Sequence, residues 1–531
     1  MSHSPLRSLF VCACLLVLVL LSLFAMATRF AMRGRVALIQ ITKPPVNSLG
    51  LAVRQGLWDG LDAAEKSGAG AVVIAGDGNT FPAGADISEF ASGGHLTEPD
   101  LNALIDRLER VTIPTVAAIH GTALGGGLEL ALGCHWRLMH EKAKAGLPEV
   151  HLGILPGAGG TQRLPRLTGC QPAIEMITSG RPVNAKKALA LGIADEVVSG
   201  GASPAEAVAE RAVAFAEGLV DKPIEPSRVV SDRVVADPGA AFWPEARKAV
   251  AKAARGFEAP LAIVEAVAAS VSAPSFAEGM EEERRLFAGL AMGTQAPALQ
   301  HVFFAERQIS KVKGPLGEAK PAPIKSAAVV GSGTMGGGIA MCFADRGVPV
   351  TLIDTSDEAL ARGVGIIRKN YEATAKKGRL TAEQVEQRMG LITPTTEYAH
   401  EGVASADIVV EAAFERMVVK KEIFKALDKH CKPGAVLASN TSTLDIDEIA
   451  SATSRPASVV GTHFFSPANV MPLLENVAGE SASPQTVATA MGLGKLLGKK
   501  AVLARNCFGF IGNRMLEGYI HEIVSPRSHF P

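Results

Sequence analysis

The chain has 531 residues, and its 53 basic residues are balanced by 53 acidic ones, so it carries no formal net charge. A neutral chain has no long-range field to attract nucleic acid, and no nucleic-acid partner is expected. Hydrophobic residues make up 47% of the sequence and there are 54 glycines, a composition typical of α/β enzymes with several domains. The seven cysteines are scattered without C-x-x-C spacing, so the sequence predicts neither a disulfide framework nor a metal site.

An apolar run sets residues 1–32 apart from the rest of the chain. Residues 9–27 are apolar except for Ser22, which is close to the length that crosses a bilayer. Three interpretations stay open: a membrane anchor, a signal peptide, and an extension that precedes a start at Met26 or Met32. Positive charges are denser after the run than before it, which keeps the remainder cytoplasmic. We therefore expect a cytoplasmic protein, anchored to a membrane if this run is a true anchor.

Short apolar runs then alternate with amphipathic stretches, which indicates an α/β domain over residues 33–202. The predicted strands are 36–41, 71–75 and 113–119, and the predicted helices are 51–66 and 98–110. Residues 203–312 have helical apolar spacing, and residues 313–323, rich in Gly and Pro, form a predicted linker. A second α/β block spans residues 324–505, and residues 506–531 begin a further helical segment.

The first block carries two glycine turns and two acids. The turn at 81–86 follows a strand, and the turn at 123–127 opens a helix whose free N–H groups favour negative charge. Two N–H donors from separate turns suit the oxyanion that forms when a thioester is enolised. Glu129, in the first turn of that helix, and Glu149 are placed to share one water molecule. Taken singly, each feature is more often structural: a tight turn, or an acid beside a helix dipole.

In this order and spacing the strings Phe-Pro-Ala-Gly-Ala-Asp, Gly-Gly-Gly-Leu-Glu and Pro-Gly-Ala-Gly-Gly-Thr resemble the crotonase (enoyl-CoA hydratase/isomerase) family, over residues 33–200. The resemblance implies a crotonase-like ββα spiral domain. It also implies an oxyanion hole made by the N–H groups of Ala83 and Gly126, and a water pocket at Gly157. The two acids named above would act on the β and α carbons in hydration, and which acid does which stays open. Isomerisation of 3-enoyl-CoA is a further activity that the motifs leave open.

The second block opens with a dinucleotide-binding pattern. A strand-like run leads into Gly331, Gly333 and Gly336, a helix and a second strand follow, and Asp354 stands at the end of that strand. Strand, glycine turn, helix, strand and acid together are the context that a Rossmann-type nucleotide site requires. Asp354 would accept both ribose hydroxyls, and no Arg follows it, so the pattern favours NAD over its 2′-phosphorylated relative.

Later strings carry the polar groups that oxidation of an alcohol needs. They are Ser-Asn-Thr-Ser-Thr, Thr-His-Phe-Phe-Ser-Pro, Pro-Leu-Leu-Glu-Asn and Gly-Phe-Ile-Gly-Asn-Arg. A neutral imidazole can take the proton of a secondary alcohol if a carboxylate orients the ring. These strings resemble the 3-hydroxyacyl-CoA dehydrogenase family over residues 324–515. The resemblance implies that His463 is the base and Glu475 its partner, and that Ser442 and Asn513 hold the substrate oxygen or support the histidine.

The order of the two blocks resembles the bifunctional hydratase/dehydrogenase family of fatty-acid β-oxidation. It implies acyl-CoA thioester substrates, NAD as cofactor, and a thiolase partner. Tethering the two sites raises the effective concentration of the alcohol that the second site oxidises. In this family helical domains follow the Asn-Arg motif, whereas this chain stops at Pro531, and it does so without the peroxisomal signal Ser-Lys-Leu. We therefore expect an intact hydratase and an impaired dehydrogenase.

Other classes of function stay open at this point. One is a hydratase or isomerase whose NAD-binding half is not catalytic. Another is a protein that only binds NAD or acyl-CoA, for which the paired acids and the histidine would be unnecessary. The third is a membrane-anchored subunit of a β-oxidation complex, in which residues 9–27 are the anchor.

Overall fold

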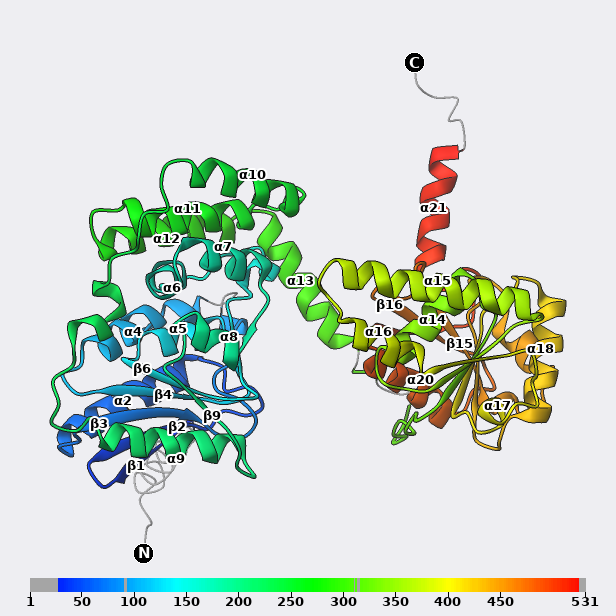
Figure 1. The fold of residues 1–531 in the computed structure, drawn as a ribbon, viewed down its shortest axis with the longest axis horizontal. Coiled ribbons are helices and arrows are strands. Elements are labelled where there is room, and N and C mark those ends of the chain that lie inside the picture. The colour runs from blue at the N-terminus through cyan, green and yellow to red at the C-terminus, as the bar shows by residue number, and fades with distance from the viewer. Residues whose placement is uncertain (1–26, 90–92, 310, 313–315, 525–531) are drawn as a thin grey trace, which may run out of the picture. The chain divides into compact units, whose positions relative to one another are not determined.

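The computed structural model describes residues 27–89, 93–309, 311–312 and 316–524. The chain divides into two compact units, Met1–Phe303 and Phe304–Pro531, each with its own hydrophobic core (Figure 1). Of the apolar run predicted over residues 9–27, the structure describes only Ala27. Within the described ranges, no helix is both long enough and apolar enough to cross a bilayer.

The first unit is built on a six-stranded sheet (Figure 1). In sheet order the strands are β1 (Thr28–Arg33), β2 (Val36–Ile41), β3 (Ala71–Gly76), β4 (Thr115–Ile119), β6 (Trp136–His140) and β9 (Glu196–Val198). β1 and β2 form an antiparallel hairpin, and all other neighbours pair in parallel. Every residue of β3 and β4 is buried, because central parallel strands are covered on both faces.

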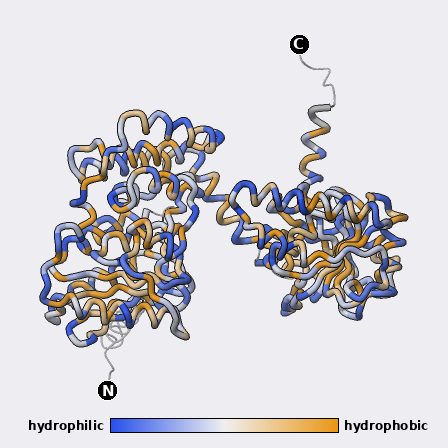
Figure 2. The backbone as a smooth tube through the Cα atoms, viewed as in Figure 1, coloured by the Kyte–Doolittle hydropathy of each residue, from blue (hydrophilic) through white to orange (hydrophobic). Residues whose placement is uncertain are grey.

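The two faces of this sheet are covered by different helices. Helix α9 (Pro204–Glu217) lays Val208, Ala212 and Ala216, each four residues apart, against buried residues of the central strands. The opposite face belongs to the main core, into which α2 (Leu51–Lys66) sends Val53, Leu57 and Leu61. Figure 2, in which hydrophobic residues are orange, shows that the strands of this sheet are largely hydrophobic.

A smaller sheet completes the spiral. Its strands are β5 (Thr122–Leu124), β7 (Lys144–Gly146) and β8 (Val183–Asn184). β4 and β6 of the large sheet each lead within a few residues into a strand of the small one, and the helix α5 (Gly126–Leu132) follows directly. This succession of strand, strand and helix is the crotonase-like fold that the sequence predicts, and the prediction is confirmed.

The remaining helices that lie within the first unit are α4 (Leu101–Arg110), α6 (Gly160–Thr168), α7 (Cys170–Ser179), α8 (Ala185–Ala190), α10 (Phe242–Ala254), α11 (Ala259–Ser272) and α12 (Phe276–Ala291). Helix α13 (Gln295–Gln308) spans the boundary between the two units at Phe303 and Phe304. The segment predicted to be helical therefore contains α9 to α13. α11 packs on α6 and α7, and α12 packs on α6 (Figure 1). The predicted helix 98–110 begins only at Leu101, because Pro99 precedes an N-cap, Asp100, whose side chain accepts a hydrogen bond from Ala103 N at 2.7 Å.

The second unit is an eight-stranded, mostly parallel sheet. In sheet order the strands are β12 (Ile392–Thr395), β11 (Val350–Ile353), β10 (Ala327–Val330), β13 (Ile408–Glu411), β14 (Val436–Ser439), β15 (Val459–Phe464), β16 (Leu473–Ala478) and β17 (Lys500–Arg505). Only the pair β15 and β16 is antiparallel. The helices are α14 (Thr334–Ala344), α15 (Asp357–Lys376), α16 (Ala382–Met389), α17 (Glu401–Ala404), α18 (Met417–His430), α19 (Ile446–Ala450), α20 (Pro484–Leu497) and α21 (Gly512–Val524). The Rossmann-type domain predicted from the sequence is confirmed.

One buried ion pair ties α18 to the end of β13. Lys420 Nζ lies 2.8 and 2.9 Å from the two carboxylate oxygens of Glu411, and both side chains are almost fully buried. Replacing Lys420 with Met leaves the Glu411 charge buried without its cation, and we expect the free energy of unfolding of this unit to fall by about 3–5 kcal/mol. The measurement is urea denaturation followed by circular dichroism.

The adjacent lysine provides the matched control. Lys421 pairs with Glu448 at 2.7 Å, but these side chains are 33% and 49% exposed. Replacing Lys421 with Met is expected to cost less than about 1 kcal/mol. Equal losses from the two substitutions would contradict a special role for the buried pair.

Candidate active sites

The turn at 81–86 and the start of α5 lie against each other, as an oxyanion hole requires. A Cβ added to Gly126 would come within 3.2 Å of the backbone nitrogen of Ala85. No acceptor for the N–H of Ala85 or of Gly126 lies among the described residues. The N–H of Ala83, by contrast, donates to Val46 O at 3.1 Å. The prediction of Ala83 as an oxyanion donor is therefore corrected, because its hydrogen is already committed, and Ala85 has the free N–H instead.

Glu129 is held by the glycine-rich loop that precedes α6. The N–H groups of Ala158 and Gly160 both donate to its Oε1, each at 2.8 Å. The side chain is only 2% exposed, and this burial raises its pKa, although the two N–H groups and the charge of Arg163 act in the opposite direction. Glu129 thus keeps a fixed orientation with one oxygen engaged.

Glu149 lies beside the turn at 123–127, and its carboxyl group has fewer hydrogen-bond partners than that of Glu129. Its Oε1 is next to Gly125, where an added Cβ would come within 2.6 Å, and its buried Oε2 has no hydrogen-bond partner among the described residues. Burial, followed by the charges of Glu129 and Glu283, raises its pKa well above the ordinary value. Glu149 therefore holds its proton more tightly than an ordinary glutamate.

Gly157 is packed against a ring. A Cβ at this position would meet the Phe287 side chain at 2.9 Å, and Asn102 Nδ2 donates to Gly157 O at 3.2 Å. The space beside the Gly157 Cα is thus filled by α12. The water pocket predicted here from the resemblance stays a prediction.

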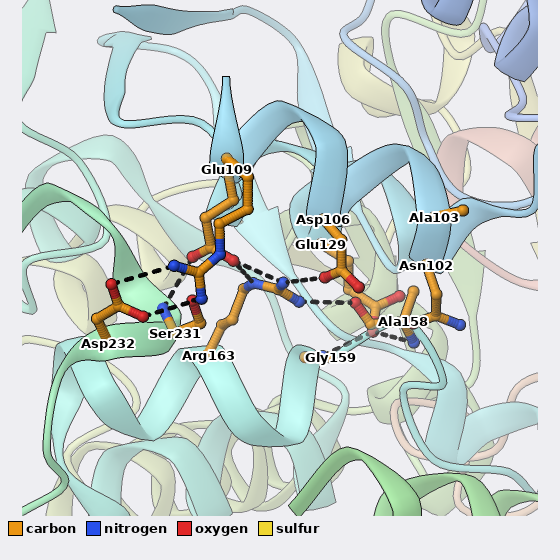
Figure 3. Close-up of polar contacts among 12 residues, drawn as sticks. Asn102, Ala103, Asp106, Glu109, Glu129, Ala158, Gly159, Arg163, Ser231 and Asp232 are labelled. Carbon is orange, nitrogen blue, oxygen red and sulfur yellow. Dashed lines mark hydrogen bonds and ion pairs between the residues drawn. The ribbon is translucent and has the colours of Figure 1, made fainter. Parts of the chain in front are cut away.

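A buried arginine lies beside this loop (Figure 3), where Arg163 Nη1 donates to Ala158 O at 3.4 Å. Arg163 donates to Glu109 at 2.7 and 3.1 Å and to Asp106 at 2.9 Å, and it is 1% exposed. Its guanidinium also lies 4.8 Å from the ring centroid of Phe276. The two acids compensate the buried cation, so Arg163 is fixed while its charge still acts on Glu129.

A groove of about 690 Å³ opens on the same unit, beside the residues that follow Glu149. Its lining is mostly apolar and includes Val150, His151, Ile174, Phe242, Val250 and Leu299. The two acids do not line it. A groove of this size and polarity suits an alkyl chain.

The glycine turn after β10 has the shape of a dinucleotide site. Gly331 has φ +99°, and a Cβ added to Gly336 would overlap the carbonyl oxygen of Gly331, so side chains are excluded at both positions. Around Gly333, which is the N-cap of α14, a Cβ would meet nothing within 4 Å. The turn thus leaves open space at the start of an 11-residue helix, where a pyrophosphate fits.

Asp354 stands at the end of β11 next to this turn. Its Oδ2 accepts hydrogen bonds from Ser332 N at 2.7 Å and from Ser332 Oγ at 2.6 Å, and its Oδ1 accepts one from Thr355 N. Burial opposes its charge, but these bonds outweigh burial and lower its pKa. Asp354 is therefore ionised at neutral pH, and a carboxylate at this place fits the ribose hydroxyls of NAD.

His463 and Glu475 face each other across the antiparallel pair β15 and β16, where they are register partners. His463 Nδ1 lies 2.7 Å from Glu475 Oε2, and Glu475 Oε1 accepts the N–H groups of Ile511 and Gly512. Burial opposes ionisation of Glu475, yet these hydrogen bonds lower its pKa. An ionised carboxylate only accepts, so Nδ1 carries the hydrogen and Nε2 is left as a base.

Ser442 and Asn513 come together, although no hydrogen bond to His463 is found for either in the described part of the chain. Asn513 Nδ2 donates to Ser442 O at 3.4 Å. Sequence reasoning missed Glu415, whose Oε1 accepts from the N and the Oγ of Ser442 at 2.8 and 3.1 Å. Lys420 Nζ lies 3.2 Å from Glu415 Oε2, which connects this loop to the buried pair. Across the described ranges, no group of three or more His, Cys, Asp or Glu side chains is placed to hold a metal ion.

Two family models match the chain. The model for enoyl-CoA hydratase/isomerase matches residues 31–285, and the model for the NAD binding domain of 3-hydroxyacyl-CoA dehydrogenase matches residues 326–507. The first match contains the site of Glu129 and Glu149, and the second contains the glycine turn, Asp354, His463 and Glu475 but ends before Asn513.

Curated relatives have both parts in one chain. The peroxisomal bifunctional enzyme of Cavia porcellus is 44% identical over 504 residues, which cover 94% of this chain and 68% of that protein. The protein of the same name from Homo sapiens is 42% identical over 503 residues, with the same coverage of both chains. The fatty acid oxidation complex subunit alpha of Shewanella amazonensis is 39% identical over 472 residues, or 86% of this chain and 65% of that one.

The location predicted from the sequence needs correction. The sequence predicts a cytoplasmic protein, anchored to a membrane if the apolar run is a true anchor. The relatives from Cavia porcellus and Homo sapiens are instead named as peroxisomal enzymes. The structure adds no membrane-spanning helix within the ranges that it describes. The prediction is therefore wrong on this comparison. The apolar run 9–27, from which the anchor was inferred, lies outside the described ranges except for Ala27.

The matches to the family models, the sequence identity to the curated relatives and the geometries of the two sites agree with one another. Both family models are named for CoA thioesters, the Shewanella relative is named as a subunit of a fatty acid oxidation complex, and the match to the NAD binding domain extends through residue 507. The chain belongs to the bifunctional enoyl-CoA hydratase and NAD-dependent 3-hydroxyacyl-CoA dehydrogenase family of fatty-acid oxidation.

Proposed function

We propose that the chain adds water to a 2-enoyl-CoA with Glu129 as base and Glu149 as acid. The observation that carries this assignment is the difference between the two carboxyls: Glu129 Oε1 accepts two N–H groups, whereas Glu149 has an unpartnered buried oxygen and the more strongly raised pKa. Hydrogen bonds from N–H groups favour an ionised carboxylate, and desolvation favours a protonated one. This supports a division of roles that the sequence leaves open.

In this proposal the thioester oxygen is held by the N–H groups of Ala85 and Gly126. As Glu129 takes a proton from water, the hydroxide adds to C3 and negative charge moves to the thioester oxygen, where the two donors stabilise it. Glu149 then gives its proton to C2, and the product is a 3-hydroxyacyl-CoA. The proton that Glu129 took from water then passes to Glu149, so both acids regain their starting states.

The second site would oxidise that product. NAD, when bound, supplies the acceptor for the hydride that leaves C3. His463 Nε2 takes the hydroxyl proton, and the Glu475 carboxylate stabilises the imidazolium that results. The loop that contains Ser442 is held by Glu415 and Asn513, and in this proposal it fixes the substrate oxygen.

The experiment that tests this function is a paired assay on the purified chain. With crotonyl-CoA alone, we expect the absorbance of the conjugated enoyl group to fall, and on addition of NAD we expect NADH to appear. The rate of NADH formation relative to that of hydration measures the second activity. Absence of hydration in a folded sample would overturn the proposed roles of Glu129 and Glu149.

A thiolase partner remains a finer proposal. The Shewanella relative is named as one subunit of a fatty acid oxidation complex. The 3-oxoacyl-CoA made by the second site is chemically the substrate of thiolytic cleavage, which supports a partner of that class. Co-purification of the tagged chain with thiolase activity tests this, and the absence of such activity at stoichiometric recovery counts against it.

A further inference from the structure

One face of α12 lies over the loop that holds Glu129. Met280, Glu283 and Phe287 are spaced three and four residues apart, so they share a face of this helix. Met280 and Phe287 are next to Gly159 and Gly157, where added Cβ atoms would come within 3.3 and 2.9 Å of their side chains. Glu283, between them, is 1% exposed. A carboxyl group is therefore buried under the active-site loop by a helix outside the predicted hydratase domain.

The loop presents its N–H groups alternately to two carboxyls. Ala158 and Gly160 donate to Glu129 Oε1. Gly159 donates to Glu283 Oε1 at 2.7 Å, and Thr161 donates to Glu283 Oε2 through its N–H at 3.0 Å and also through its hydroxyl. Four successive N–H groups are thus divided between an acid of α5 on one side and an acid of α12 on the other.

The two carboxyls differ in whether one of their oxygens is free to accept a hydrogen bond. Both oxygens of Glu283 are engaged by the loop, so it has no free oxygen for a substrate. No donor to Glu129 Oε2 lies among the described residues, so that oxygen stays available to water. The orientation of Glu129 depends on the loop, and the loop is fixed from its far side by Glu283.

We propose that Glu283 is a positioning residue of the hydratase, which fixes the 158–161 loop and thereby aims the free oxygen of Glu129 at the attacking water. It rests on the role proposed above for Glu129. The hydratase site then needs α12 for its geometry, in addition to the two turns and two acids that the sequence indicates.

The charges around Glu283 define a readout beyond geometry. Glu129 on α5 and Glu149 in the η2 turn (Glu149–Leu152) face it, Arg163 on α6 lies against the same loop with Glu109 behind it, and on α12 itself the neighbouring acid Glu282 pairs with Arg285 in solvent. Burial and the charge of Glu129 raise the pKa of Glu283 to about 8. When ionised, it raises the pKa of Glu149. Above about pH 8, where Glu283 is ionised, removing this charge lowers the pKa of Glu149.

The test compares Glu283→Gln with Glu282→Gln in the intact chain, with crotonyl-CoA as substrate. A glutamine offers one acceptor oxygen, and its NH₂ group would oppose an N–H of the loop. We expect kcat for hydration to fall about 10- to 100-fold in Glu283→Gln, since small misplacements of a catalytic group have effects of this size. KM should stay within about twofold because Glu283 does not touch substrate. The alkaline limb of the kcat profile should move to lower pH, because Glu149 loses its proton earlier. Glu282→Gln should match the wild type.

Each outcome decides the question. If kcat and the pH profile of Glu283→Gln equal those of the wild type, Glu283 has no positioning role. If activity falls only in proportion to the folded fraction measured by circular dichroism, with an unchanged profile, its role is merely structural and the proposal is overturned. If Glu283→Gln does not fold, Thr161→Val must lower kcat without raising KM, or the proposal fails. This variant keeps the Thr161 N–H bond to Glu283 and removes the hydroxyl, which donates to Glu283 and accepts from Gln162 Nε2 at 3.0 Å. A wild-type chain that does not hydrate crotonyl-CoA instead refutes the roles of Glu129 and Glu149.

Discussion

Replacing Glu149 with Gln is expected to lower kcat for hydration of crotonyl-CoA by about 10²- to 10⁴-fold, the usual contribution of a positioned general acid. Glutamine keeps the volume and removes the proton that C2 receives. The pH dependence should change as well. In the wild type the acid is present below the raised pKa of Glu149 and lost as pH rises through it, so kcat falls at the alkaline end. Glutamine cannot lose this proton, and the residual rate should lack that limb.

The dehydrogenase reaction supplies the internal control for this variant. With a 3-hydroxyacyl-CoA and NAD as substrates, Glu149→Gln should form NADH at the wild-type rate, because Glu149 lies in the other unit. Hydration within about threefold of the wild type would show that Glu149 is a bystander. Loss of both reactions would indicate a folding defect instead.

Replacing His463 with Gln is expected to produce the reciprocal result, a loss of about 10²- to 10⁴-fold in NADH formation with hydration unchanged. His463 is 6% exposed, and its Nδ1 is held by a carboxylate whose other oxygen is itself fixed by two backbone N–H groups. The ring thus has one orientation, with Nε2 as its free base. Glutamine retains a donor to Glu475 and lacks the base.

NAD binding separates this chemical role from a structural one. The change in NADH fluorescence on binding should be the same for His463→Gln as for the wild type. His463 belongs neither to the glycine turn nor to the part of the site that binds the ribose. A variant that forms NADH at the wild-type rate would remove His463 from the proposal. A variant that fails to bind NADH would point to a damaged fold.

The parts of each site that lie within short, contiguous motifs could be predicted from the sequence. Gly331, Gly336 and Asp354 follow from a turn in which backbone approaches backbone, and that requirement is local. His463 and Glu475 were also found as separate motifs. Their pairing across β15 and β16 depends on register, but two short strands joined by a brief connection leave few alternatives.

The errors came where the deciding contact is distant in sequence. Within the turn at 81–86, nothing local distinguishes the N–H of Ala83 from that of Ala85, and the difference arises from Val46, which accepts only the first. Glu415 acts through Ser442 in a similar way, across two different strands of the sheet.

Glu283 illustrates a third difficulty. It stands in an acidic run, Glu281-Glu282-Glu283, that is typical of a solvated helix face. Helical spacing from Met280 and Phe287 would have marked it as the inward member of the run. That spacing indicates burial only, and the loop that Glu283 binds lies more than a hundred residues earlier in the chain.

The alternating capture of N–H groups by Glu129 and Glu283 also restricts how the chain can vary in length at this place. Because successive N–H groups donate to opposite sides, deletion or insertion of a single residue between Gly157 and Thr161 would exchange the N–H groups that meet the two carboxyls. Surface loops ordinarily accept such changes. This loop has the register constraint of a β-strand, for which a slip of one residue reverses every direction.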